Sequence, residues 1–202
     1  MLSYKTIRSM LAEGRSRLSI GRAGEVAALV LAQPSKASDL MKCLWDEDPA
    51  VANRAADALE KVSHALPSVL NPWKAPLLGL LAEATQNKLR WHLAIIVPRL
   101  KLTGAETKRV ADVLRTYLED QSSIVKTCAM QGLADLTSQN SSLLQQVLDL
   151  LRVLSRTGSP AMRARGRLLL VTLEATEEIP KSGAFQVRKT RSSITPENRN
   201  RR

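Results

Sequence analysis

The sequence has few of the residues from which catalytic centres are built. Its 202 residues include two histidines and two cysteines, and only 3% are aromatic. Cys43 and Cys128 lie far apart, form no CxxC pattern and have no histidine at metal-ligand spacing, so we expect free, buried thiols and no metal site. No GxGxxG, P-loop, GxSxG or HExxH pattern occurs. We therefore expect no cofactor and predict that the protein is not an enzyme.

Long apolar runs are also missing. No segment approaches the roughly 18 apolar residues needed to cross a bilayer, and the N-terminus lacks the apolar core of a signal peptide. We expect no membrane contact and a cytoplasmic location. The apolar residues Leu2, Ile7, Met10 and Leu11 stand among arginines, so an organelle presequence stays possible, but we favour a basic N-terminal capping helix over residues 1–20.

Positive charge is in excess, but it is unevenly distributed. The formal net charge is +11. Five basic residues and one acid give +4 in residues 1–22, and seven basic residues and three acids give +4 in 177–202, which leaves +3 for 23–176. We interpret 177–202 as a disordered basic tail because it combines few apolar residues with many charges. Nucleic-acid contact through the basic termini is possible, although basic ends also aid solubility.

With so few aromatic residues, leucine, alanine, valine and isoleucine must form the core, and their helical spacing predicts an all-α protein. The stretch Asp46–Leu66 shows the pattern best. Asp48 precedes Pro49, which suits an N-cap followed by proline in the first helical position. Apolar residues then recur every three or four positions on one side: Val51, Ala55, Ala58, Leu59 and Val62.

Similar helices recur along the chain with a period near 37 residues. Each repeat is predicted to be a pair of helices. When the second helices of the pairs are aligned, Val51, Leu89, Val125 and Met162 fall in one column, at spacings of 38, 36 and 37 residues. Further columns hold Ala55, Leu93, Ala129 and Gly166, then Leu59, Val97, Leu133 and Leu170, then Val62, Leu100, Leu136 and Leu173. This register predicts an alpha-alpha superhelix of about four helix pairs over 21–176. Pro98 is the exception, because a proline there should kink its helix or end it early.

Residues Asp48–Leu59, DPAVANRAADAL, resemble the D-P-x-V-R-x-x-A-A-x-A-L second helix of the HEAT-repeat family, an armadillo-type alpha solenoid. Ala52 stands where an arginine often follows the valine, and Arg54 lies two positions on. The resemblance covers about residues 21–176. It implies that the second helices line the concave side of the array.

On that basis the helix sides opposite the buried stripe predict a binding groove. We expect Trp91, Ile95 and Leu168 on its floor. The expected basic edge comprises Arg54, Lys61, His92, Arg99 and Arg165. An apolar floor with a basic border suits an acidic amphipathic helix or peptide. The alternative is that the apolar residues pack between helices or beneath a tail, and that the basic edge is ordinary solvated surface.

Two functions follow as hypotheses. The first is a non-enzymatic protein–protein interaction scaffold that uses the concave groove. The second is nucleic-acid binding, suggested by resemblance to HEAT-like DNA alkylation-repair glycosylases, which use a basic concave face with aromatic residues and a carboxylate. Trp45, Trp73 and Trp91 are the aromatic candidates for such a face. The body charge of only +3 and the placement of these tryptophans in different helices weigh against the second hypothesis.

Overall fold

A computed structural model describes residues 4–14 and 19–177, so the predicted tail at 177–202 lies almost wholly outside the described residues. In this part of the chain there are helices and no strand. The α-helices are α1 (Tyr4–Ala12), α2 (Ala23–Ala32), α3 (Ala37–Lys42), α4 (Pro49–Ala65), α5 (Lys74–Glu83), α6 (Asn87–Ile96), α7 (Gly104–Tyr117), α8 (Ser123–Leu136), α9 (Leu144–Thr157) and α10 (Pro160–Glu177). The short 3-10 segments are η1 (Pro34–Lys36), η2 (Cys43–Trp45), η3 (Pro67–Trp73), η4 (Val97–Arg99) and η5 (Ser141–Leu143).

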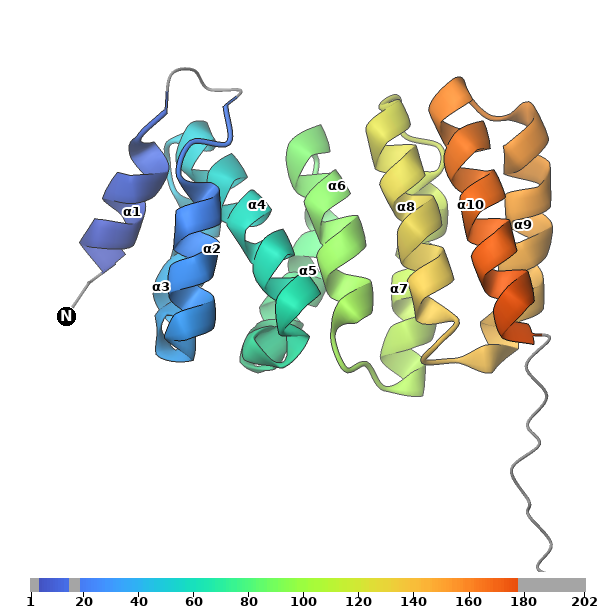
Figure 1. The fold of residues 1–202 in the computed structure, drawn as a ribbon, viewed down its shortest axis with the longest axis horizontal. Coiled ribbons are helices and arrows are strands. Elements are labelled where there is room, and N and C mark those ends of the chain that lie inside the picture. Colours follow the sequence, from blue (N-terminus) through green and yellow to red (C-terminus); the bar gives the residue numbers. More distant parts are fainter. Residues whose placement is uncertain (1–3, 15–18, 178–202) are drawn as a thin grey trace, which may run out of the picture.

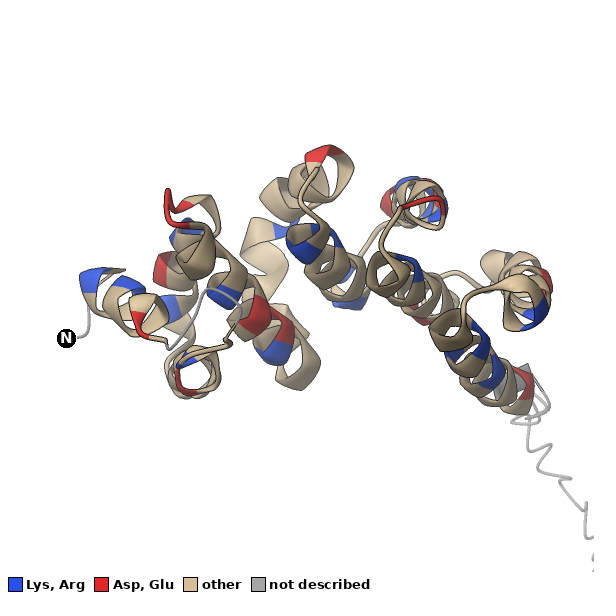
Figure 2. Ribbon diagram, turned by 90° about the horizontal axis from the view of Figure 1, so that it is seen from above, with Lys and Arg blue, Asp and Glu red and all other residues tan. Residues whose placement is uncertain are grey.

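The helices form two layers in an all-α superhelical array. The even-numbered helices α2, α4, α6, α8 and α10 stand side by side in one row, each packed on the next, and α3, α5, α7 and α9 lie behind them (Figure 1). Seen from above, the row bends into an arc, with its two ends forward of its middle (Figure 2). The all-α superhelical fold predicted from the sequence is confirmed. One detail differs from the prediction. The columns aligned in the sequence begin with α4, whereas in the structure α2 is the first helix of the even-numbered row.

The first helix closes the N-terminal end of the array. It packs on α2, α3 and α4, and its Ile7 and Leu11 are fully buried. An amphipathic helix at the end of a stack covers apolar surface that would otherwise face water. The capping helix predicted from the sequence spans residues 1–20, whereas α1 is 9 residues long and ends at Ala12.

Local sequence signals determine where the helices start. The Asp48 carboxylate accepts a hydrogen bond of 2.8 Å from the Ala50 amide at the start of α4, with Pro49 in the first turn, as predicted. Thr103 and Glu106 form a reciprocal capping box at the start of α7. Pro98 has the expected effect, since α6 ends at Ile96 and the chain continues as η4.

One hydrophobic core runs through the whole array. Most of the aligned columns are buried in it, including Val51, Leu93 and Leu133, while Leu89 and Leu170 are only partly buried. Gly132 lets α8 approach α6 closely, because a Cβ atom there would lie 2.3 Å from the carbonyl oxygen of Ala94. Among the described residues, no helix is both long and apolar enough to span a membrane.

Candidate functional site

The predicted groove residues lie mainly on α4, α6 and α10, and some of them are exposed whereas others are buried. We call the exposed side of the even-numbered helices the even face. Lys61 of α4 is exposed there and forms an ion pair with Asp57 one turn earlier. Arg165 of α10 is also exposed, and Leu168 is 64% exposed. These side chains are accessible to a partner.

Arg54 requires a correction, because it is buried and does not belong to an exposed basic edge. It is only 3% exposed, and its guanidinium donates hydrogen bonds to the carbonyl oxygens of Leu11 (2.6 Å), Ala12 (3.1 Å) and Ser19 (2.9 Å). The carbonyls at a helix C-terminus lack intrahelical partners and carry partial negative charge. Arg54 therefore caps the end of α1, and α1 covers it.

Ile95 also requires a correction, since it is 8% exposed and contributes little to a groove floor. Its neighbour Ala94 lies against Gly132 of α8, so the even-numbered helices approach too closely at this level to leave α6 open. Trp91, one turn earlier, is half-buried and packs against the core. The middle of the even face is thus less apolar than expected.

His92 and Arg99 were predicted as basic edge residues, but both are committed to contacts with α4. His92 is 7% exposed, and its Nδ1 atom lies 2.5 Å from a carboxylate oxygen of Glu60. Arg99 is half-buried and donates to the Ser63 hydroxyl at 3.0 Å and to the Glu60 carbonyl at 3.3 Å. His92 therefore does not belong to an open basic edge, and Arg99 contributes only in part.

The carboxylates of the even face differ in their pKa values. Burial alone would raise the pKa of Glu60, but the hydrogen bond from His92 and the charges of His92, Arg99 and Lys61 outweigh it and lower the pKa. For Asp135 on α8, burial dominates and raises the pKa, although Gln131 donates a hydrogen bond of 2.7 Å to it. The Gln131 amide oxygen in turn accepts from Arg165 at 3.2 Å, which links α8 to α10.

The two cysteines are held as thiols. Burial raises the pKa of Cys43 to about 12. Burial and the nearby Glu60 carboxylate raise the pKa of Cys128 to about 11. Since the thiolate is the nucleophile and the metal ligand, neither side chain is activated at neutral pH. Across the described segments, no group of three or more His, Cys, Asp and Glu side chains is placed to hold a metal ion.

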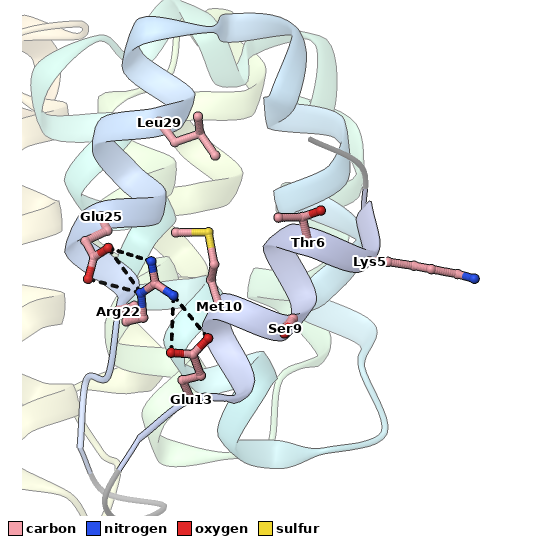
Figure 3. Close-up of a pocket in the computed structure, with 8 residues that line it drawn as sticks. All are labelled: Lys5, Thr6, Ser9, Met10, Glu13, Arg22, Glu25 and Leu29. Atoms are coloured by element: carbon pink, nitrogen blue, oxygen red, sulfur yellow. Dashed lines mark hydrogen bonds and ion pairs between the residues drawn. The ribbon is translucent and has the colours of Figure 1, made fainter. Parts of the chain in front are cut away.

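A second concave feature lies at the N-terminal end, where α1 meets α2. It is an open cleft of about 630 Å³. In its wall Arg22 lies between Glu13 and Glu25, with N–O distances of 3.0 and 2.8 Å, and the Met10 side chain points into the space between α1 and α2 (Figure 3). These charges compensate one another, so the cleft has no strong preference for a charged ligand.

Sequence reasoning missed a charge pair that recurs between helix pairs. The Asp46 carboxylate accepts from Arg8 at 2.6 and 2.9 Å and from the Asp48 amide at 3.0 Å. A second aspartate, Asp120, repeats this arrangement with an arginine of α6. In each case the aspartate stands two residues before an N-cap, and this spacing is the signal that the sequence offered.

Comparisons with known proteins support the fold. No protein-family model matches the chain. No curated protein sequence matches it either. A crystal structure of an engineered protein is similar over 85% of this chain and 79% of that chain, with a TM-score of 0.58 and 16% sequence identity. At this identity the similarity shows the helical fold alone.

Proposed function

We propose that this chain is a HEAT-like repeat protein of the cytoplasm that binds a segment of a partner protein along its even face. The observation that carries the proposal is the kind of side chain left accessible there. Lys61 and Arg165 are exposed and cationic, Leu168 is 64% exposed, and Trp91 is half-buried. Aromatic, aliphatic and arginine side chains together are the usual anchors of protein interfaces.

The polar groups in the middle of the face support binding over catalysis. Glu60, His92 and Arg99 already bond to one another's helices, and the Cys128 thiol is protonated at neutral pH. Satisfied groups of this kind hold the helices in register and form a rigid platform. The partner that suits such a platform is an acidic, amphipathic segment, because the two exposed charges among the predicted groove residues, Lys61 and Arg165, are both positive.

A matched pair of variants tests this function. Lys61→Glu combined with Trp91→Ala alters the even face, whereas Lys108→Glu with Trp73→Ala changes an exposed lysine and a half-buried tryptophan elsewhere. Partners captured by the wild-type chain are expected to be lost with the first variant and kept with the second. Equal loss or equal retention with both folded variants would rule out the even face as the binding surface.

Nucleic-acid binding is the second candidate, and the basic residues in 1–22 and 177–202 favour it. We expect any DNA binding of the full chain to weaken steeply with salt and to disappear when residues 178–202 are deleted. Binding by the deleted chain that persists at moderate salt would favour this candidate over protein binding.

A further inference from the structure

The last helix carries an apolar stripe that no described residue covers. Leu168 and Val171 of α10 are 64% and 70% exposed, and they are among the most exposed large apolar side chains in the described chain. Ala161, Ala164 and Ala175 are also exposed. Steps of three, four, three and four residues join these five positions, which is the spacing of one continuous side of a helix. We call them the α10 stripe.

The stripe faces away from the rest of the array. The opposite side of α10 packs inward through Gly166, where an added Cβ atom would lie 3.1 Å from Ser155 of α9 and 3.3 Å from Met130 of α8. At 100° per residue, Leu168 lies 200° from Gly166 around the helix axis. The stripe is therefore not a surface that α8 or α9 could bury.

Arginines border the stripe. Arg165 lies on the side toward α8, where it donates to Gln131, and Arg167 lies on the other side. Arg163 adds a third exposed cation one turn before Arg167. None of the three forms an ion pair with a carboxylate of the described residues. Figure 2 shows basic residues along α10 and an acid only toward its C-terminal end.

This pattern determines the chemistry of the occupant. The positive end of the helix dipole lies at Pro160, next to the arginines, and adds to their attraction for carboxylates. A phosphate backbone could pair with the arginines but would leave Leu168 and Val171 exposed to water. A second copy of the chain docked through the same stripe would place its own Arg165 and Arg167 beside these arginines, and the like charges would repel.

We propose that α10 is the docking site for an acidic amphipathic α-helix of a partner protein, a proposal that rests on the function proposed above. The partner helix lies along α10 with its apolar side on Leu168 and Val171. Its acidic residues flank that side and pair with Arg165 and Arg167. The alanines of the α10 stripe let the two helix backbones approach closely.

Synthetic helical peptides of the length of α10, 18 residues, test the site directly. One peptide carries leucines at heptad spacing flanked by glutamates, and the other carries the same leucines flanked by lysines. Fluorescence anisotropy with the full chain is expected to show tighter binding of the glutamate peptide by about tenfold or more. Equal binding of both peptides, or no binding of the glutamate peptide, would overturn the proposal.

Variants of the chain place the peptide on α10. Two variants are compared: the single substitution Leu168→Asp, and the double substitution Arg165→Glu with Arg167→Glu. Each is expected to lower the affinity for the glutamate peptide by about tenfold. Val153→Asp is the matched control, because Val153 is 57% exposed on α9 and should have no effect. A dimer that Leu168→Asp dissolves, or DNA that displaces the peptide from α10, would identify a different occupant and overturn the proposal.

This test separates two kinds of failure. One outcome is that Lys61→Glu with Trp91→Ala still abolishes partner capture, while Leu168→Asp leaves the affinity for the glutamate peptide unchanged. In that case the even face binds proteins and only the α10 site is wrong. If neither partner capture nor peptide affinity changes in these variants, both proposals fail together.

Discussion

Arg90 and Asp120 hold two neighbouring helix pairs together through an ion pair of 2.6 Å. The aspartate side chain is only 3% exposed, and its other oxygen accepts from the Ser122 amide at 2.7 Å. The arginine also donates to the Ala84 carbonyl at 2.6 Å and lies 5.1 Å from the centre of the Tyr117 ring. One side chain thus ties the end of α5, the end of α7 and the start of α8 to α6.

Replacing this aspartate should destabilise the fold. We expect Asp120→Asn to lower the free energy of unfolding by about 2–4 kcal/mol, because the half-buried Arg90 loses its counter-charge. The control is Asp112→Asn, since Asp112 is 73% exposed in its pair with Arg115 and should cost less than about 1 kcal/mol. Urea denaturation measures both. Equal costs would show that the buried pair has no special role.

Stability should fall in acid for the same reason. Although burial would raise them, the pKa values of Asp46 and Asp120 are lowered by hydrogen bonds from arginine side chains and backbone amides. Their stabilising effect is complete above the unfolded-state value of about 3.9 and is lost as the pH falls through the lower folded-state values. Between pH 6 and pH 3, the free energy of unfolding measured in urea should fall less in the doubly substituted Asp46→Asn, Asp120→Asn chain than in the wild-type chain. An unchanged pH dependence would contradict this account.

Arg54 should be essential for the first helix. We expect Arg54→Met to free the carbonyls of Leu11 and Ala12 and to cost about 2–3 kcal/mol. Hydrogen exchange should accelerate throughout α1 while α8 stays protected. If α1 keeps its protection in this variant, Arg54 does not act as its cap.

Two glycines should respond in opposite directions to alanine. Gly132→Ala places a Cβ atom 2.3 Å from the Ala94 carbonyl oxygen and 2.9 Å from Leu114, so we expect a loss of about 1–2 kcal/mol. Gly79 lies in α5 with nothing within 4 Å of its Cβ position, so Gly79→Ala should gain about 0.5–1 kcal/mol. Thermal unfolding of the two variants gives both signs. A stabilised Gly132→Ala would mean that α6 and α8 are not closely packed.

The helices were predictable because their signals are local. Asp48 and Pro49 mark the start of α4, and the spacing of Val51, Ala55 and Leu59 determines its buried side. Helical phase shows which side of a helix a residue is on, but it does not show which distant segment covers that side. The first helix packs on α4 and buries Arg54. The hydrogen bonds of Arg54 join residues more than 30 positions apart in the sequence, which no local pattern encodes.

The candidate site was predictable in part for the same reason. Lys61, Arg165 and Leu168 lie on open helix sides, where phase alone decides exposure. Ile95 lies where α6 approaches α8, and the closeness of that approach depends on Gly132 in another repeat. His92 is buried because it pairs with Glu60 of α4, a contact that also crosses from one repeat to another. The Arg90–Asp120 pair requires two repeats to be placed correctly before it can be seen.

Photo-crosslinking from single positions tests the central claim most directly. A photo-reactive amino acid at Leu168 reports on the even face, and one at Val153 reports on a similarly exposed apolar position of α9. We predict that Leu168 crosslinks to a defined partner protein through an acidic helical segment and that Val153 does not. Crosslinks of the same proteins from both positions, or from neither, would contradict the account.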